Sequence, residues 1–358
     1  MKTKISLMIA LFLMALTLAI NIGKIEKTDL FFQGIQAQTY LPAKIDFANE
    51  STDVLVSTLY RNPTTLFQPI ASSGAKGVNI LFENGQSTNW YIEEQKVGEE
   101  LIIAGILNNN PTVIANGFKV FDWGFARQAA NGSFPGTSDD FHSTSFFVQA
   151  VSRALLFIQL SPQASSYTAQ IAYYKPLVRR AALWMISPTI WPVGIKRNIP
   201  YTHRRYLVAS ALGLTGKLTG DQQLISFART SLTDGISLQL ANGVNPEKGG
   251  YDSSYQMVGL AYAQRWVTYF PTDAITPQII AMINKGLGWE KGRILTTGEI
   301  STIGNTRTGP DALDFNRTGN PKSVDNRFVL RGFGYWASAT GDKNLEDVAR
   351  KIAGFYYK

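Results

Sequence analysis

Residues 211–230, ALGLTGKLTGDQQLISFART, contain an apolar helix end, a Thr-Gly pair, a short polar turn and a second helix with Ala and Leu facing inward. Residues 336–351, WASATGDKNLEDVARK, repeat these features in the same order. Helix hairpins that recur every roughly 40–50 residues are typical of α-solenoids and closed α/α toroids. We therefore expect an all-α protein, more specifically an α/α toroid built as an incomplete barrel of helix hairpins.

Apolar residues elsewhere in the chain also recur at helical spacing, as in Phe146, Phe147 and Ala150. Gly216 and Gly341 are predicted to end helices. The predicted helices cover residues 46–60, 89–107, 112–129, 140–160, 167–186, 203–214, 221–238, 253–270, 277–287, 325–340 and 344–357.

The chain shows no second break in composition after residue 43, so residues 44–358 are expected to form one α/α-toroid catalytic domain. One segment, residues 292–303 (GRILTTGEISTI), has the Gly and Thr turns of a β-hairpin. We expect a small β-hairpin or a long loop near residues 292–324, lying over a pocket.

The N-terminus has the features of an export signal. Lys2 and Lys4 precede an apolar run over residues 5–20, which is slightly short for a membrane span. Residues 1–43 are expected to be a signal peptide or an N-terminal anchor, followed by a linker. If they are an anchor, residues 5–20 would insert into the membrane. In either case the body is expected to be secreted, periplasmic or anchored on the outer side of the cytoplasmic membrane. The chain has no cysteine, which excludes disulfides and thiolate metal sites.

The formal net charge is +8, which favours polyanionic partners. The sequence has no compact Lys/Arg run and no nucleic-acid-binding motif, so an acidic polysaccharide is a better candidate than a nucleic acid. The abundant tyrosines and tryptophans suit the flat faces of sugar rings. The alternative is that the positive charge serves solubility alone.

Three loop-to-helix junctions gather polar side chains of the kinds found in active sites. They are residues 199–219 (IPYTHRRYLVASALGLTGKLT), 249–256 (GGYDSSYQ) and 132–142 (GSFPGTSDDFH). Histidine titrates near neutrality and arginine pairs well with carboxylates, so a single shared pocket is predicted. The candidate residues at these junctions are Tyr201, His203, Arg204, Arg205, Tyr251, Asp252, Tyr255, Gln256, Asp140 and His142.

Several enzyme motifs are absent, including GxSxG, HExxH, the Walker loop and GxGxxG. The two histidines with Asp139 or Asp252 are a conceivable metal site, but their spacing gives no support, so neither a metal nor another cofactor is expected. Asp139, Asp140 and Asp252 include a candidate acid and base for an inverting glycosidase, a common activity of α/α toroids. Asp139 and Asp252 also stand where helix N-caps belong.

A third chemistry is β-elimination on a uronic-acid polymer. The enzyme must neutralise the sugar carboxylate, remove the poorly acidic C5 proton and protonate the leaving glycosidic oxygen. Arg, His and amide side chains serve the first task, and a tyrosine near a cation serves the proton transfers. His203, Arg204 or Arg205, and Tyr255 with Gln256 are residues of these kinds.

Residues 199–216 (IPYTHRRYLVASALGLTG) resemble the Asn-His-Ser-Tyr helix start of alginate-lyase-type α/α-toroid polysaccharide lyases. Residues 249–266 (GGYDSSYQMVGLAYAQRW) resemble the later helix of those enzymes, which carries the catalytic tyrosine. The resemblance implies that His203 is the base or carboxylate-neutralising histidine and Tyr255 the acid/base tyrosine. The family's asparagine is Thr202 here, and only Lys248 lies near its arginine position.

With those departures, carboxylate neutralisation would fall to Arg204, Arg205 or Gln256. Arg307 lies in an irregular stretch, residues 296–324, and is either a second carboxylate clamp or a solvated loop residue. Trp90 either stacks on sugar or packs in the core. His142 either contacts substrate or is a satisfied polar residue at a helix start.

The sequence thus favours an exported polysaccharide lyase that cleaves an acidic, uronate-containing polysaccharide, such as an exopolysaccharide, by β-elimination. Its expected catalytic residues are Tyr255, His203, Arg204 and Arg205. The expected substrate-binding residues are Gln256, Tyr201, His142, Asp140, Tyr251, Asp252, Arg307 and Trp90. Two alternatives stay open: an α/α-toroid glycoside hydrolase that uses aspartate pairs, and a non-catalytic polysaccharide-binding protein of the cell surface.

Overall fold

The structure, a computed structural model, describes residues 46–63, 67–316 and 319–357. Its elements in these ranges are all helical, as the sequence predicted, and only isolated β-bridges join the loops. The elements are α2 (Asp46–Glu50), α3 (Asp53–Leu55), η1 (Val56–Tyr60), α5 (Val78–Glu83), η2 (Ile92–Lys96), α6 (Val97–Leu107), α7 (Pro111–Phe125), α8 (Asp140–Leu160), η3 (Ala164–Tyr167), α9 (Thr168–Met185), α10 (Trp191–Arg197), α11 (Thr202–Thr219), α12 (Gln222–Ser237), α13 (Ser253–Tyr269), α14 (Thr276–Lys291), α15 (Asn326–Thr340) and α16 (Lys343–Tyr356).

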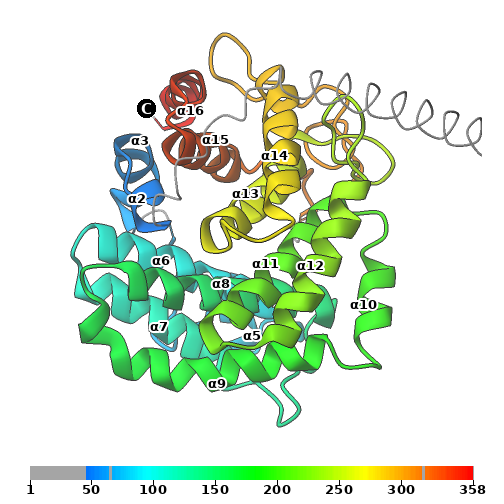
Figure 1. The fold of residues 1–358 in the computed structure, drawn as a ribbon. Helices are drawn as coiled ribbons and strands as arrows, with labels where there is room; N and C mark the ends of the chain where they lie inside the picture. Colours follow the sequence, from blue (N-terminus) through cyan, green and yellow to red (C-terminus); the bar gives the residue numbers. More distant parts are fainter. Residues whose placement is uncertain (1–45, 64–66, 317–318, 358) are drawn as a thin grey trace, which may run out of the picture. The chain divides into compact units, whose positions relative to one another are not determined.

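The longer helices form successive pairs along the chain (Figure 1). The pairs in contact are α6 with α7, α8 with α9, α11 with α12, α13 with α14 and α15 with α16. The first helix of each pair also contacts the first helix of the next, from α6 through α8, α11 and α13 to α15. The short helix α2 contacts α8, α13 and α15. All of these elements belong to one compact unit, which spans Ala43–Lys358.

Most predicted helices are present, with different ends. The region 46–60 is broken into two short α-helices and the π-helix η1, and residues 92–96 form the 3-10 helix η2. The sequence did not predict α5 or α10, which have only 6 and 7 residues. The predicted stop at Gly216 is wrong, because α11 continues to Thr219 and ends at Gly220. Gly220 has φ +75°, a left-handed conformation that glycine adopts without steric cost, and Gly341 ends α15 in the same way.

Aspartate side chains start several helices. Asp139 accepts a hydrogen bond from the backbone N–H of His142 at the start of α8, and Asp252 accepts one from Tyr255 at the start of α13. These caps satisfy backbone donors that the first helical turn leaves unpaired. The expected capping roles of Asp139 and Asp252 are therefore confirmed.

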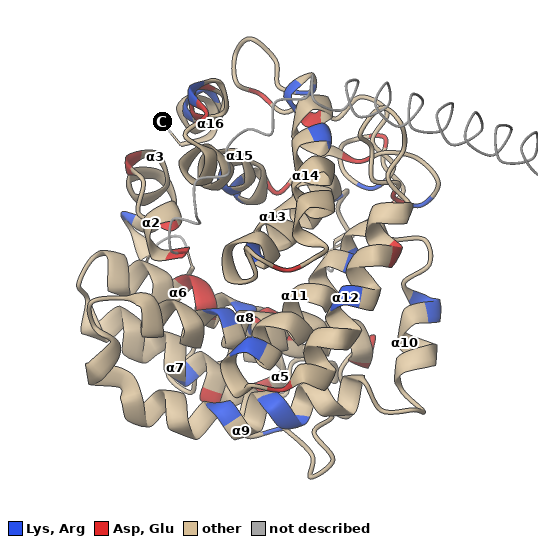
Figure 2. Cartoon of the chain, viewed as in Figure 1, with Lys and Arg blue, Asp and Glu red and all other residues tan. Residues whose placement is uncertain are grey.

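A buried charge cluster holds α2 against the longer helices. The Arg153 guanidinium on α8 pairs with Asp46 at 2.8 Å, Glu50 at 2.6 Å and Glu99 at 2.9 Å, and all four side chains are buried. Figure 2 shows acidic and basic segments close together where α6 and α8 lie. Removing one partner from such a cluster leaves a buried charge unpaired, which is strongly unfavourable. The cluster therefore fixes the position of α2.

Residues between α14 and α15 form a long loop in which no strand is found over its described part. A single antiparallel bridge joins Ile294 and Ile300, with Leu295 N–H donating to the Glu299 carbonyl at 2.9 Å. Of the two expectations for residues 292–324, the long loop is the one observed. The predicted signal or anchor segment, residues 1–43, lies outside the described residues. Within them, only α8 has the length and composition of a membrane span, and most of that helix is buried.

Candidate active site

The first turn of α11 is capped by a residue from a distant loop. Tyr201, at the N-cap, makes no side-chain capping bond. The Glu247 Oε1 atom instead accepts a hydrogen bond from the backbone N–H of His203 at 2.8 Å, and it also lies 2.8 Å from the Nδ1 atom of the same residue. When Glu247 is ionised, Nδ1 of His203 carries the proton, and Nε2 presents its lone pair.

Burial governs the charges of this pair. His203 is 1% exposed, and burial, followed by the nearby Arg307, holds the pKa of His203 well below its usual value. Burial raises the pKa of Glu247 to about 7, against the opposing effect of Arg307. The imidazole is therefore neutral, and its carboxylate partner ionises near neutral pH.

Tyr255 occupies the first turn of α13, which lies beside α11. Its ring centroid is 4.7 Å from that of His203. The Arg307 guanidinium lies over the tyrosine ring at 3.4 Å from the centroid, and the Lys322 Nζ donates to the tyrosine hydroxyl at 3.3 Å. The ring of Tyr255 thus lies beside a neutral imidazole and the Arg307 guanidinium, and its hydroxyl contacts the Lys322 ammonium.

The long loop that carries Arg307 is fastened to both helix starts. Asp252 accepts hydrogen bonds from the backbone N–H groups of Arg307 at 2.9 Å and Thr308 at 2.8 Å. The Arg307 side chain pairs with Glu247 at 3.1 Å and with Asp314 at 2.9 Å. Although burial opposes it, hydrogen bonds from Lys248 and Arg307 lower the pKa of Asp314 to about 2, so this carboxylate stays ionised.

These groups open into one cavity of about 660 Å³. His142, His203, Arg204, Tyr255 and Arg307 all line it, so the structure brings residues from the three predicted junctions and the long loop together. The other charged residues of its lining are Lys96, Lys322, Glu93, Glu94 and Asp139.

His142 and Arg204 complete the polar wall of this cavity. Burial, followed by Arg204, lowers the pKa of His142 well below its usual value, and its Nδ1 is buried without a hydrogen-bond partner among the described residues. Arg204 pairs with Asp139 at 3.0 Å and lies over the ring of Tyr201 at 4.2 Å. Tyr201 does not line the cavity itself but supports Arg204 from behind.

Three other predicted site residues have structural contacts outside the cavity. Arg205 pairs with Asp234 at 2.9 Å and donates to main-chain carbonyls before α11. The side chain of Gln256 is buried, where its amide accepts from Asn245 N–H at 2.8 Å and donates to the Gly243 carbonyl at 2.9 Å. Tyr251 donates to the Ile303 carbonyl at 3.3 Å.

The remaining predicted site residues also lie outside the cavity lining. Asp252 is 1% exposed and engaged by the long loop, and Asp140 pairs with Arg197 at 3.3 Å. Trp90 packs edge-on against Trp123, with ring centroids 6.0 Å apart, in agreement with the core alternative.

Sequence reasoning missed Glu247, Asp314, Lys322 and Lys96. Glu247 stands in the turn Pro246-Glu247-Lys248-Gly249, just before the junction that was selected, and a helix start without a capping side chain is a signal that another group must supply the cap. The other three residues reach the site only through the fold.

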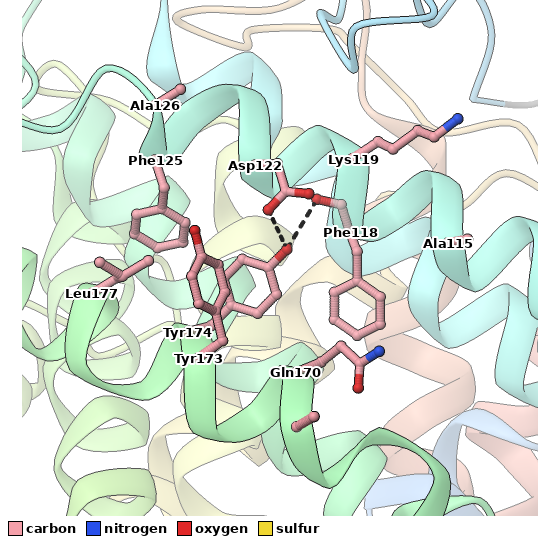
Figure 3. Close-up of a pocket in the computed structure, with 11 residues that line it drawn as sticks. Ala115, Phe118, Lys119, Asp122, Phe125, Ala126, Gln170, Tyr173, Tyr174 and Leu177 are labelled. Atoms are coloured by element: carbon pink, nitrogen blue, oxygen red, sulfur yellow. Dashed lines mark hydrogen bonds between the residues drawn. The ribbon is translucent and has the colours of Figure 1, made fainter.

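A larger groove, of about 900 Å³, lies between α7 and α9 (Figure 3). It is lined mainly by Phe118, Tyr173, Tyr174 and small apolar residues. Its carboxylate, Asp122, accepts a hydrogen bond from the Tyr174 hydroxyl at 2.6 Å. With no histidine or arginine in its lining, this groove lacks the acid/base groups of the smaller cavity, which we therefore take as the candidate active site.

Comparisons of the chain with protein-family models, curated proteins and solved structures found no match. Within the described ranges there is also no group of three or more His, Asp or Glu side chains suited to hold a metal ion. The assignment of function below therefore depends on the geometry of the cavity and on the sequence resemblance.

Proposed function

We propose that the protein is an exported polysaccharide lyase that cleaves a uronate-containing polymer by β-elimination. The contact between His203 and Tyr255, with Arg307 over the tyrosine ring and Lys322 at its hydroxyl, carries this proposal. We also propose that the helix pairs form an α/α toroid, since the first helices of successive pairs contact one another in chain order. Export is proposed from residues 1–43 alone.

The geometry favours His203 as the base, one of the two roles that the resemblance left open. A neutral imidazole whose Nδ1–H is directed at Glu247 accepts a proton at Nε2. The ionised Glu247 then stabilises the imidazolium, as the carboxylate of a catalytic triad does. Such an imidazole cannot at the same time neutralise a carboxylate by charge, so that task falls to Arg204, Arg307 and Lys322.

The proposed reaction uses His203 as the base and Tyr255 as the acid. His203 Nε2 takes the C5 proton of the uronate, and the electron pair left on C5 forms the C4=C5 double bond. The C4–O glycosidic bond breaks, and the leaving oxygen takes the hydroxyl proton of Tyr255. Lys322 stabilises the negative charge that develops on the tyrosine oxygen. The imidazolium then returns its proton to the tyrosinate, which restores both residues.

The hydrolase alternative has less support. It needs two carboxyl groups facing one substrate, about 6.5–9.5 Å apart in an inverting enzyme. Glu93, Glu94 and Asp139 line the cavity, but the aspartate pair expected from the sequence is not assembled there. Asp252 lies outside the lining, and its oxygens accept hydrogen bonds from Tyr255, Arg307 and Thr308. The binding-only alternative keeps the same cavity and differs in activity alone.

Incubation of the purified protein with a panel of polyuronates tests the proposal. A lyase releases an unsaturated uronate, which absorbs in the ultraviolet, together with one new reducing end per cleavage. New reducing ends without the absorbance would indicate the hydrolase. Binding of a polyuronate without either product would leave the non-catalytic alternative, and both results would overturn the lyase.

A further inference from the structure

The candidate active site continues into two smaller cavities. One, of about 310 Å³, shares Lys96, Phe146, Tyr255, Asn316 and Lys322 with the first. A third, of about 270 Å³, shares Lys96, Asp325 and Phe328 with the second. Lys96 lines all three, so the cavities adjoin one another at this residue, and we call the three together the trough.

Aromatic rings line this trough in a row. Phe146 lies next to the active site, where its ring centroid is 4.8 Å from that of His142. Tyr262 lies between Phe146 and Phe328, with its centroid 6.3 Å from that of Phe146 and 5.8 Å from that of Phe328. Its side chain is only 1% exposed, so it supports the other two rings and does not itself stack on a ligand. Phe146 and Phe328 are only partly buried, so their rings are accessible. Apolar sugar faces stack on rings exposed in this way.

Lys96 is the cation that all three cavities share. The third cavity is also lined by carboxylates, of which Glu99, Glu100 and Asp325 are paired with Arg153, Arg331 and Arg327. The Lys96 Nζ lies 4.4 Å from the centroid of Phe146, and it makes no ion pair with any residue that the structure describes. The other cations nearest Tyr255 have partners: Arg307 pairs with Glu247 and Asp314, and Lys322 lies 3.4 Å from Asp314. Glu94 also lines this part of the trough. Its side chain packs against Gly77, so closely that a Cβ atom added at Gly77 would come within 2.7 Å of the Glu94 Oε2 atom.

We propose that Lys96, Phe146 and Phe328 form a second sugar subsite, in which Lys96 binds the carboxylate of the uronate next to the one that reacts. The proposal depends on the proposed function for the reacting sugar. It narrows the substrate to polymers with consecutive uronates. In a polymer that alternates uronates with uncharged sugars, the neighbouring ring would bring no carboxylate to Lys96.

The test measures binding separately from turnover. Calorimetric titrations use the full chain carrying Tyr255→Phe, with two tetrasaccharides: one of consecutive uronates, and one in which uronates alternate with uncharged sugars. Adding Lys96→Gln should weaken binding of the consecutive-uronate tetrasaccharide about 10-fold, the scale of one charge-assisted contact. The same change should weaken binding of the alternating tetrasaccharide less than about twofold. Lys96→Arg should retain the affinity. Lys175→Gln, at an exposed position of α9, is the matched control and should change neither.

Unchanged affinity in Lys96→Gln, or equal loss for both ligands, would overturn the subsite. Absence of binding to either ligand would overturn it as well. Thermal melting checks that each variant is folded, and if Lys96→Gln is not, Lys96→Met takes its place in the same comparison. Wild-type turnover decides the lyase independently. If binding depends on Lys96 but the wild type forms no unsaturated product, the subsite stands and the lyase is rejected. If the wild type forms that product but binding does not depend on Lys96, the lyase stands and the subsite is rejected.

Discussion

The Nδ1 atom of His203 lies 2.8 Å from the Oε1 atom of Glu247, and this same oxygen accepts the backbone N–H of His203. One carboxylate thus caps α11 and orients the imidazole ring. The two residues are 44 positions apart in the chain. A single loop residue, Glu247, therefore both caps the start of α11 and orients the proposed base, His203.

The pH dependence of turnover should report the ionisation of Glu247. Its pKa of about 7 means that the ionised form, which stabilises a His203 imidazolium, is gained as pH rises through about 7. We expect kcat/KM to rise over that range in pH–rate profiles. Glu247→Gln should lower kcat/KM at least about 10-fold and remove this rise. Glu299→Gln, an exposed change in the long loop, should keep the wild-type profile. If the pH–rate profile of Glu247→Gln matches that of the wild type, the rise in kcat/KM comes from the ionisation of another group.

The same ionisation predicts a trend in stability of the opposite sign. The pKa of Glu247 is raised in the folded state above its usual value of 4.5, so the folded protein binds the proton more tightly than the unfolded chain. Its contribution to stability is fully present below about pH 4.5 and is lost as pH rises through about 7. Denaturant titrations from pH 5 to about 8 should show a smaller decline in unfolding free energy for Glu247→Gln than for the wild type.

Removal of the Tyr255 hydroxyl should abolish most activity. Tyr255→Phe conserves the ring that contacts His203 and Arg307 but leaves no group to protonate the leaving oxygen. We expect kcat to fall at least about 10²-fold, the usual scale of a positioned acid, with little change in melting temperature. Tyr206→Phe is the control, since the Tyr206 hydroxyl is buried and has no hydrogen-bond partner in the part of the chain that the structure describes. Near-normal kcat in Tyr255→Phe would reject the mechanism.

Loss of the Lys322 charge should slow the chemical step. Its ammonium is 3.3 Å from the Tyr255 hydroxyl, where it stabilises the oxygen as the proton leaves. Lys322→Gln should lower kcat at least about 10-fold, and Lys322→Arg should restore part of the loss. The exposed Lys175→Gln on α9 should have no effect. A change confined to KM would mean that Lys322 only binds substrate.

Asp252 should matter for stability rather than for chemistry. If Asp252 served only as a helix cap, Asp252→Asn would be mild, because asparagine also caps helices. In the structure, its Oδ1 caps α13 and its Oδ2 accepts from the Arg307 and Thr308 backbone, so an amide nitrogen at either position faces a donor. Chemical denaturation of Asp252→Asn should therefore show a loss of about 1–3 kcal/mol.

The matched control is Asp342→Asn at the start of α16. There a single oxygen, Oδ1, accepts both backbone donors, so asparagine can replace aspartate with little cost. An equally small effect at Asp252 would show that the loop does not depend on its second oxygen.

The sequence by itself determined the helical class, the approximate positions of the longer helices and the aspartate caps. These features depend on residues three or four positions apart, whose contacts form within one helix whatever surrounds it. The sequence also selected His203, Arg204, His142, Tyr255 and Arg307, which now line one cavity.

Tertiary structure alone decided which neighbours of those residues reach the cavity. Arg205 follows Arg204 in the chain, yet it points to Asp234, because adjacent residues on a helix face different directions. Lys322 reaches Tyr255 from 67 positions away, and Glu247 reaches His203 across a loop. Contacts of this kind have no local periodicity in the sequence, since they depend on how separate loops are fastened over the helix starts.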